Sequence, residues 1–83
     1  MDIYKGENNF YIGNESEPIG QLTYSIRDNI MYINHVFVVS HLRGQGIAGD
    51  LMNFALNYAK EENLDIEPIC SYARSFIFRE GNN

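Results

Sequence analysis

Apolar and polar positions alternate through the first half of the chain, with the period of two that is typical of half-buried β-strands. The clearest run spans 19–27, and the pattern resumes over 30–39 after an Asp-Asn turn at 28–29. Shorter strands are predicted at 2–6 and 10–12. These runs predict an antiparallel meander.

Strict alternation along 30–39 would place one set of residues on each face of the sheet. One set comprises Met31, Ile33, His35, Phe37 and Val39, and the other comprises Ile30, Tyr32, Asn34, Val36 and Val38.

The hydrophobic period changes from two to about 3.6 residues near position 46. Apolar residues then recur three and four apart as far as Ala59, which predicts an amphipathic helix over 46–61. Asn63 suits the position just after this helix, because asparagine tolerates the left-handed backbone that ends many helices.

The rest of the chain predicts a strand over 64–70 and a short helix from Ser71 to about residue 79. Pro68 has no N–H to donate, so this strand should lie at an edge or splay from its neighbour there. Ser71 would be the N-cap of the last helix. Strand 30–39, the first helix and strand 64–70 would form one β-α-β unit with parallel strands.

Composition limits the functions that this chain can have. Its 83 residues, of which 45% are hydrophobic, are enough for a single domain over 1–83 with one thin core. The net charge of −5 argues against nucleic-acid and anionic-membrane partners, which require a basic surface. The single cysteine excludes an internal disulfide and a multi-cysteine zinc site, so no metal is expected. With no signal-like segment and no long apolar run, we expect a cytoplasmic protein.

The joint between strand 30–39 and the helix is the candidate binding segment. A helix start carries free N–H groups and a partial positive charge, and glycines before it allow an anion to approach closely. We therefore interpret 43–48 as a phosphate-binding loop rather than an ordinary glycine turn. It comprises Arg43, Gly44, Gln45, Gly46, Ile47 and Ala48.

Residues 44–49 also fit G-x-G-x-x-G, the fingerprint of dinucleotide-binding proteins. That fingerprint begins directly at a strand end in a mostly parallel sheet. Here residues 40–43 intervene and the preceding strands are antiparallel, which disfavours nicotinamide or flavin binding.

Arg43-x-x-Gly46-x-Ala48 instead resembles the R/Q-x-x-G-x-G/A loop that binds the acyl-CoA pyrophosphate in GNAT acetyltransferases. Asn34-His35 and residues 69–72 extend the resemblance to the short, bacterial YjdJ-type branch of acetyl-CoA-binding proteins. The implied fold class is α/β (α+β). It is a truncated GNAT-like fold, with an antiparallel meander followed by a β-α-β unit and a short C-terminal helix.

The resemblance implies a small N-acetyltransferase that uses acetyl-CoA, with coenzyme A as product, and an unidentified amine or thiol acceptor. The alternatives are a non-catalytic CoA-binding sensor and a plain interaction module. Two departures stand out. The first helices of full-length GNAT enzymes have no counterpart here, and Phe76 stands where related chains often place a proton-donating tyrosine.

The resemblance also implies roles for residues outside the loop. Main-chain groups of Val36, Phe37, Val38 and Val39 would hold the pantetheine arm of the cofactor. A free N–H there would polarise the thioester carbonyl.

Cys70 and His35 are the candidate catalytic residues. The thiol would accept the acetyl group or protonate the CoA sulfur, and the imidazole would act as a general base. Their structural alternatives are a small core thiol and a histidine bonded to backbone, and Tyr72 is a further candidate proton donor. We expect no direct bond between Cys70 and His35. If Cys70 is level with Val39, His35 lies about 13 Å back along the strand.

Overall fold

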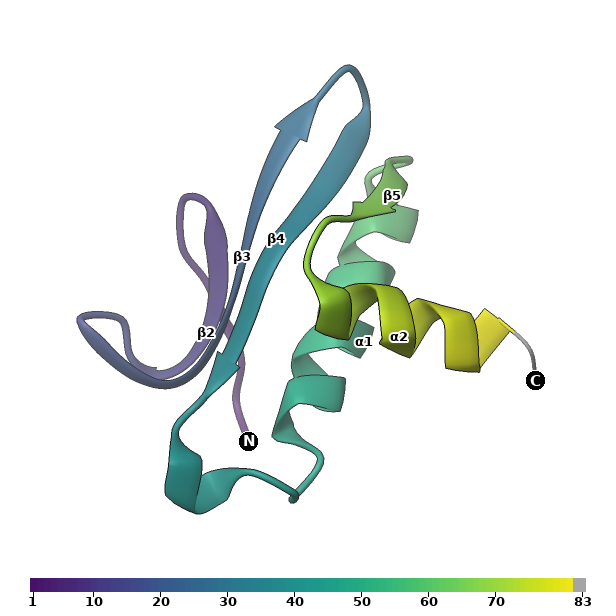
Figure 1. Cartoon of the computed structure of the whole chain (residues 1–83). Helices are drawn as coiled ribbons and strands as arrows, with labels where there is room; N and C mark the ends of the chain where they lie inside the picture. Colours follow the sequence, from purple (N-terminus) through teal and green to yellow (C-terminus); the bar gives the residue numbers. More distant parts are fainter. Residues whose placement is uncertain (82–83) are drawn as a thin grey trace.

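The computed structural model describes residues 1–81, which form a five-stranded sheet and two α-helices (Figure 1). The strands are β1 (Tyr4–Lys5), β2 (Asn9–Asn14), β3 (Glu17–Arg27), β4 (Ile30–Val38) and β5 (Asp65–Pro68). The helices are α1 (Ile47–Glu61) and α2 (Ser71–Gly81), and the 3-10 turn η1 (Ser40–Leu42) precedes α1. The predicted fold class is confirmed.

The strands lie in the order β1-β2-β3-β4-β5. The first four are antiparallel neighbours, and β5 runs parallel to β4 at the edge of the sheet. β5 is shorter than the predicted strand 64–70, because it ends at Pro68. No helix within residues 1–81 is long and apolar enough to span a membrane.

β4 contains one extra residue relative to the stretch of β3 with which it pairs. Ile33 and His35 pair with consecutive residues of β3, so Asn34 is the extra residue of a β-bulge. The bulge changes which residues face the core: Ile33 and Val38 are buried, whereas His35 is exposed. The strict alternation predicted for 30–39 is therefore wrong beyond Ile33.

The helices and the sheet enclose one hydrophobic core. α1 packs on β3 at Gly20, where an added Cβ would lie 3.3 Å from Cγ2 of Ile47, so glycine lets the helix approach closely. α2 packs against α1 and the β4–β5 edge. The buried side chains are Phe10, Ile12, Leu22, Tyr24, Met31, Ile33, Val38, Ile47, Leu51, Met52, Ala55, Ala59, Ala73 and Phe76.

Two backbone features predicted from the sequence are confirmed. Asp28 and Asn29 both have positive φ, at 55° and 63°, as a two-residue hairpin turn requires. Asn63 has a φ of 58°, and the N–H groups of Asn63 and Leu64 donate to carbonyls of the last turn of α1. This Schellman arrangement ends α1 and turns the chain into β5.

Replacing Asn63 should test this helix end. Asn63→Ala should lower the free energy of unfolding by about 1–2 kcal/mol, because alanine strongly disfavours the left-handed backbone. For a domain of this size, each kcal/mol corresponds to a fall in melting temperature of about 4–8 °C. Asn63→Gly should melt at or above the wild-type temperature, because glycine adopts this backbone freely. Equal melting of the two variants would contradict this account of the helix end.

Candidate functional site

β4 and β5 are paired at their beginnings and then separate. The parallel register runs from Ile30 opposite Asp65 to Ile33 opposite Pro68. The next two N–H groups, of Ile69 and Cys70, both donate to the Ile33 carbonyl, at 2.9 and 3.3 Å. Beyond this point β4 continues to Val38 while the chain after β5 turns away into α2. The sheet therefore opens directly after the bulge.

The opening exposes one edge of the β4 main chain. The N–H of Val39 donates to the Ile19 carbonyl at 2.9 Å, so this residue points its main-chain groups toward β3. In an antiparallel ladder the direction alternates, so Val36 and Val38 point theirs away from β3. The Val38 carbonyl accepts a hydrogen bond from Nε of Arg43 at 3.1 Å. The main-chain groups of Val36 face the space that β5 leaves.

The loop before α1 depends on two glycines in the left-handed region. Gly44 and Gly46 each have a φ of 82°, and nothing lies within 4 Å of where a Cβ would be. Glycine is therefore required here for the backbone conformation and not for lack of space. Gly46 occupies the N-cap position of α1 and supplies no side-chain hydrogen bond. The first N–H groups of the helix thus remain available to a ligand.

Arg43 holds this loop against the end of β4. Its Nε bond to the Val38 carbonyl ties the loop to the strand, and the guanidinium has further N–H donors. This hydrogen bond supports the interpretation of Arg43 as an anchor of the loop.

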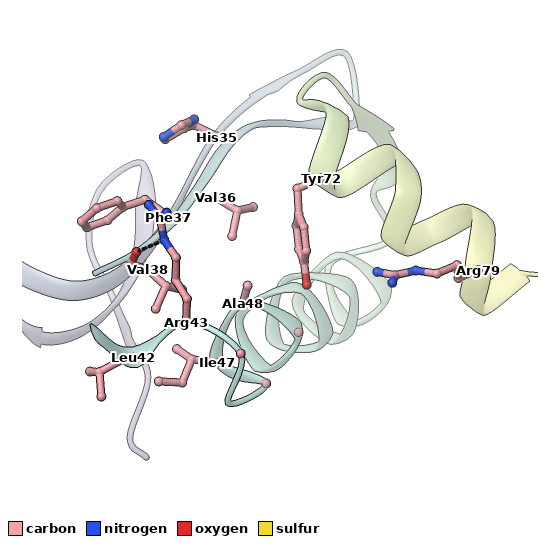
Figure 2. A pocket seen from close by; sticks show the side chains of 13 residues that line it. His35, Val36, Phe37, Val38, Leu42, Arg43, Ile47, Ala48, Tyr72 and Arg79 are labelled. Atoms are coloured by element: carbon pink, nitrogen blue, oxygen red, sulfur yellow. Dashed lines mark hydrogen bonds between the residues drawn. The ribbon is translucent and has the colours of Figure 1, made fainter. Parts of the chain in front are cut away.

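A cavity of about 490 Å³ lies between β4, the loop, the start of α1 and α2 (Figure 2). It is lined by His35, Val36, Phe37, Val38, Leu42, Arg43, Gly44, Gly46, Ile47, Ala48, Gly49, Tyr72 and Arg79. The structure thus brings together all the predicted site residues except Val39, Gln45 and Cys70. Leu42, Gly49 and Arg79 also line the cavity, and the sequence analysis assigns none of them to the site.

Cys70 does not line this cavity and is the N-cap of α2. Its Sγ accepts a hydrogen bond from the N–H of Ala73 at 3.4 Å, and its carbonyl accepts one from the N–H of Arg74 at 3.1 Å. The side chain is partly buried against the core. The prediction of Ser71 as N-cap is wrong by one residue, because the chain turns into the helix immediately after the splayed end of β5.

The distance expected between Cys70 and His35 rested on a wrong register. Pro68 is opposite Ile33 and the N–H of Cys70 still donates to the Ile33 carbonyl, so Cys70 lies near Ile33 and is not level with Val39. The side chains nevertheless form no hydrogen bond with each other within residues 1–81. Sγ is directed to the start of α2, and Figure 2 shows the His35 ring pointing away from the cavity.

Tyr72 brings a hydroxyl group into the cavity. Its side chain extends between Val36 and α1, with the oxygen directed toward the first turn of α1 (Figure 2). That oxygen lies 4.0 Å from where a Cβ on Gly49 would be, so glycine leaves room for it. Phe76, one turn further along α2, is only 8% exposed and belongs to the core. The aromatic side chain that can donate a proton here is therefore Tyr72.

One perturbed tyrosine lies outside the site. Burial raises the pKa of the Tyr24 hydroxyl above its ordinary value of 10.0, and the nearby positive charge of Lys5 opposes this shift. Tyr24 stacks on Phe10, with 4.8 Å between ring centroids, and does not line the cavity. The raised pKa of Tyr24 therefore results from its burial in the core and not from the cavity. Within residues 1–81, no three metal-ligating side chains lie close enough together to hold an ion.

Deletion of Asn34 should test the role of the bulge. The deletion leaves Ile33 and His35 opposite consecutive residues of β3, so every core side chain keeps its face. We expect cooperative unfolding to be retained. The affinity for acetyl-CoA, the ligand that the family resemblance implies, should fall by about tenfold or more, because the bend that the bulge gives β4 is lost. Asn34→Ala keeps the residue count and loses only an exposed bond to Ser25, so it should bind normally. Equal binding by both variants would show that the opening does not depend on the bulge.

Comparison with known proteins agrees with this geometry. A family model described as GCN5-related N-acetyl-transferase matches residues 9–82. The NMR solution structure of a GCN5-like protein from Staphylococcus aureus is 36% identical, with a TM-score of 0.82 over 98% of this chain and 81% of that one. No curated protein matches this chain significantly.

Two larger proteins share the fold over about half of their length. A Pyrococcus furiosus protein described as an acetyl transferase is 30% identical, with a TM-score of 0.60 over 81% of this chain and 51% of that one. An aminoglycoside N-acetyltransferase determined with CoA has a TM-score of 0.63 at 18% identity, over 76% of this chain and 55% of its own. Since the family model covers most of the sequence, the chain belongs to the GCN5-related N-acetyltransferase family.

Proposed function

We propose that this protein binds acetyl-CoA in the cavity and transfers the acetyl group to an amine acceptor. The observation that carries the proposal is the juxtaposition of an uncapped helix start with an open edge of β4. The first suits a pyrophosphate and the second suits the amides of a pantetheine arm. Both belong to one cavity. Membership of the short YjdJ-type branch remains a prediction.

The pyrophosphate would lie against the start of α1. Gly44 and Gly46 have no Cβ to keep an anion at a distance, and the uncapped helix start adds its first N–H groups and its partial positive charge. The pantetheine arm would then follow β4 into the opening, where its amides replace the missing strand and pair with the main chain of Val36. This mode of binding uses hydrogen bonds that β5 would otherwise make.

Catalysis would take place where Val36 and Tyr72 face each other (Figure 2). The acceptor nitrogen attacks the acetyl carbonyl, and a β4 N–H stabilises the negative charge that develops on its oxygen. As the tetrahedral intermediate collapses, the C–S bond breaks and the electron pair leaves on the CoA sulfur. The Tyr72 hydroxyl would protonate that sulfur, and the amine proton would be lost to water.

Tyr72 is a better candidate than Cys70 for the group near the sulfur. Its hydroxyl enters the cavity, whereas the Cys70 thiol is already bonded to the start of α2. Cys70 remains the candidate for a thiol acceptor only if that bond opens.

A non-catalytic CoA-binding module is the second candidate. The observation that favours it is the open sheet face opposite α1, where the exposed His35 and the half-buried Phe37 meet no helix of residues 1–81. Release of free CoA thiol, measured with and without a panel of amines, separates the two functions. Release no faster than in buffer, together with acetyl-CoA binding, would identify a binding module.

The binding proposal can be tested with a charge placed at the start of α1. Acetyl-CoA at a hundredfold excess over Kd should stabilise the wild-type fold by about 2.7 kcal/mol, or roughly 10–20 °C in melting temperature. Ala48→Glu should abolish most of this shift by repelling the pyrophosphate. An acidic residue in the first turn of a helix favours the helix, so the variant should remain folded.

Ala48→Gln is the matched control, because it adds nearly the same bulk without the charge. It should keep clearly more of the ligand-induced shift than Ala48→Glu does. Gly46 is less suitable for this test, since its φ of 82° makes any side chain there strain the loop. A wild-type melting curve that millimolar acetyl-CoA leaves unchanged would refute the proposal itself.

The role of Tyr72 predicts a specific kinetic change. Tyr72→Phe should lower turnover by about a hundredfold while leaving the KM for acetyl-CoA nearly unchanged, because only proton donation is removed. Tyr32→Phe removes a hydroxyl outside the cavity and should keep full turnover. A Tyr72→Phe enzyme that is as fast as wild type would assign the proton donor elsewhere.

A further inference from the structure

The cavity is positively charged although the whole chain is acidic. The sequence contains 11 Asp and Glu against 6 Lys and Arg. Among the described residues that line the cavity, two are arginines, Arg43 and Arg79, and none is acidic. Such a local excess of positive charge, on a surface that is elsewhere dominated by acidic residues, fits a ligand with several negative charges.

The two arginines are not in the same situation. Arg43 is bonded through Nε to the Val38 carbonyl and helps to form the loop. Arg79 is exposed and has no hydrogen bond or ion pair with any of the described residues. Nothing in the described fold therefore requires the charge of Arg79, although its side chain lines the cavity.

Helical periodicity explains how Arg79 reaches the cavity. It follows Tyr72 by seven residues, which is close to two turns, so both side chains project from the same face of α2. The distance between them along the helix is about 10 Å. Figure 2 shows Arg79 beyond Tyr72, on the side of the cavity away from β4. A charge there lies too far from the β4–Tyr72 gap to act on a thioester, but it lines the same cavity as the start of α1.

We propose that Arg79 binds the 3′-phosphate of the adenosine part of coenzyme A. This inference rests on the proposed function. CoA carries a pyrophosphate, for which the start of α1 supplies donors, and a separate 3′-phosphomonoester with close to two negative charges at pH 7. A guanidinium group binds a phosphomonoester through paired N–H donors. Among the described residues that line the cavity, Arg79 is the arginine without a partner, so it can bind this second phosphate and make the site selective for CoA over its 3′-dephospho form.

The test compares two ligands that differ only in this phosphate. Isothermal titration at low salt should show that wild type binds CoA about fivefold to tenfold more tightly than 3′-dephospho-CoA. In Arg79→Gln, CoA should bind with the affinity that dephospho-CoA has for wild type. Affinity for dephospho-CoA should be the same in both proteins within about twofold.

Arg74→Gln is the matched control, because Arg74 is on the same helix, bonds to the Ile69 carbonyl and does not line the cavity. It should keep the wild-type preference for CoA. Equal affinities of wild type for the two ligands would overturn the inference, and so would a preference that survives in Arg79→Gln. An equal loss of affinity for CoA and dephospho-CoA in Arg79→Gln would also overturn it. If wild type binds neither ligand, the proposed function itself fails.

A measurement on the wild-type protein completes the test without a variant. In NMR titrations, the side-chain Nε–H signal of Arg79 should shift with CoA and stay in place with dephospho-CoA. The amide signals of Gly44 and Gly46 should shift with both ligands, because both carry the pyrophosphate. An Arg79 signal that responds equally to the two ligands would contradict the assignment.

Discussion

The site depends on a strand that is paired on both sides at its start and on one side at its end. Unpaired main-chain groups inside a protein are costly, so a sheet normally keeps them paired or in contact with water. Here the bulge at Asn34 and the end of β5 at Pro68 coincide, and the unpaired edge of β4 opens into a cavity. An amide-bearing ligand can then complete the sheet. The same strand therefore contributes Ile33 to the core and Val36 to the site.

The loop before α1 adds a second set of unsatisfied donors next to the first. A serine or aspartate at the N-cap would stabilise α1, but its side chain would occupy the N–H groups that a phosphate needs. Gly46 leaves them free and adopts a backbone that other residues disfavour. Arg43 compensates by tying the loop to Val38. The helix start therefore lacks the stability that a cap would provide, and the ligand that we propose would restore it on binding.

Features set by local backbone chemistry could be predicted from the sequence, and features set by the pairing of distant segments could not. The turn at 28–29 and the helix end at Asn63 follow from residues that tolerate positive φ. The bulge could not be predicted, because an extra residue in one strand is defined only by the pairing with its partner strand. Without the bulge, the predicted alternation assigned the residues of β4 beyond Ile33 to the wrong faces of the sheet. The position of Cys70 depended on a parallel register that the sequence does not encode locally. Arg79 enters the site only because α2 crosses α1 at Gly49.

The open face of the sheet explains how so short a chain remains folded without further helices in residues 1–81. Apolar residues on that face would have to be shielded from water, but several of its side chains are polar and interact with one another. Asn9 donates to Gln21 at 2.8 Å, and the Arg27 guanidinium lies 4.8 Å from the centre of the Tyr32 ring. A face of this kind can be in contact with water on an antiparallel sheet. The core then needs only the two helices on the other side, and those helices, with β4, also form the walls of the cavity. The same elements therefore both pack the core and form the cavity.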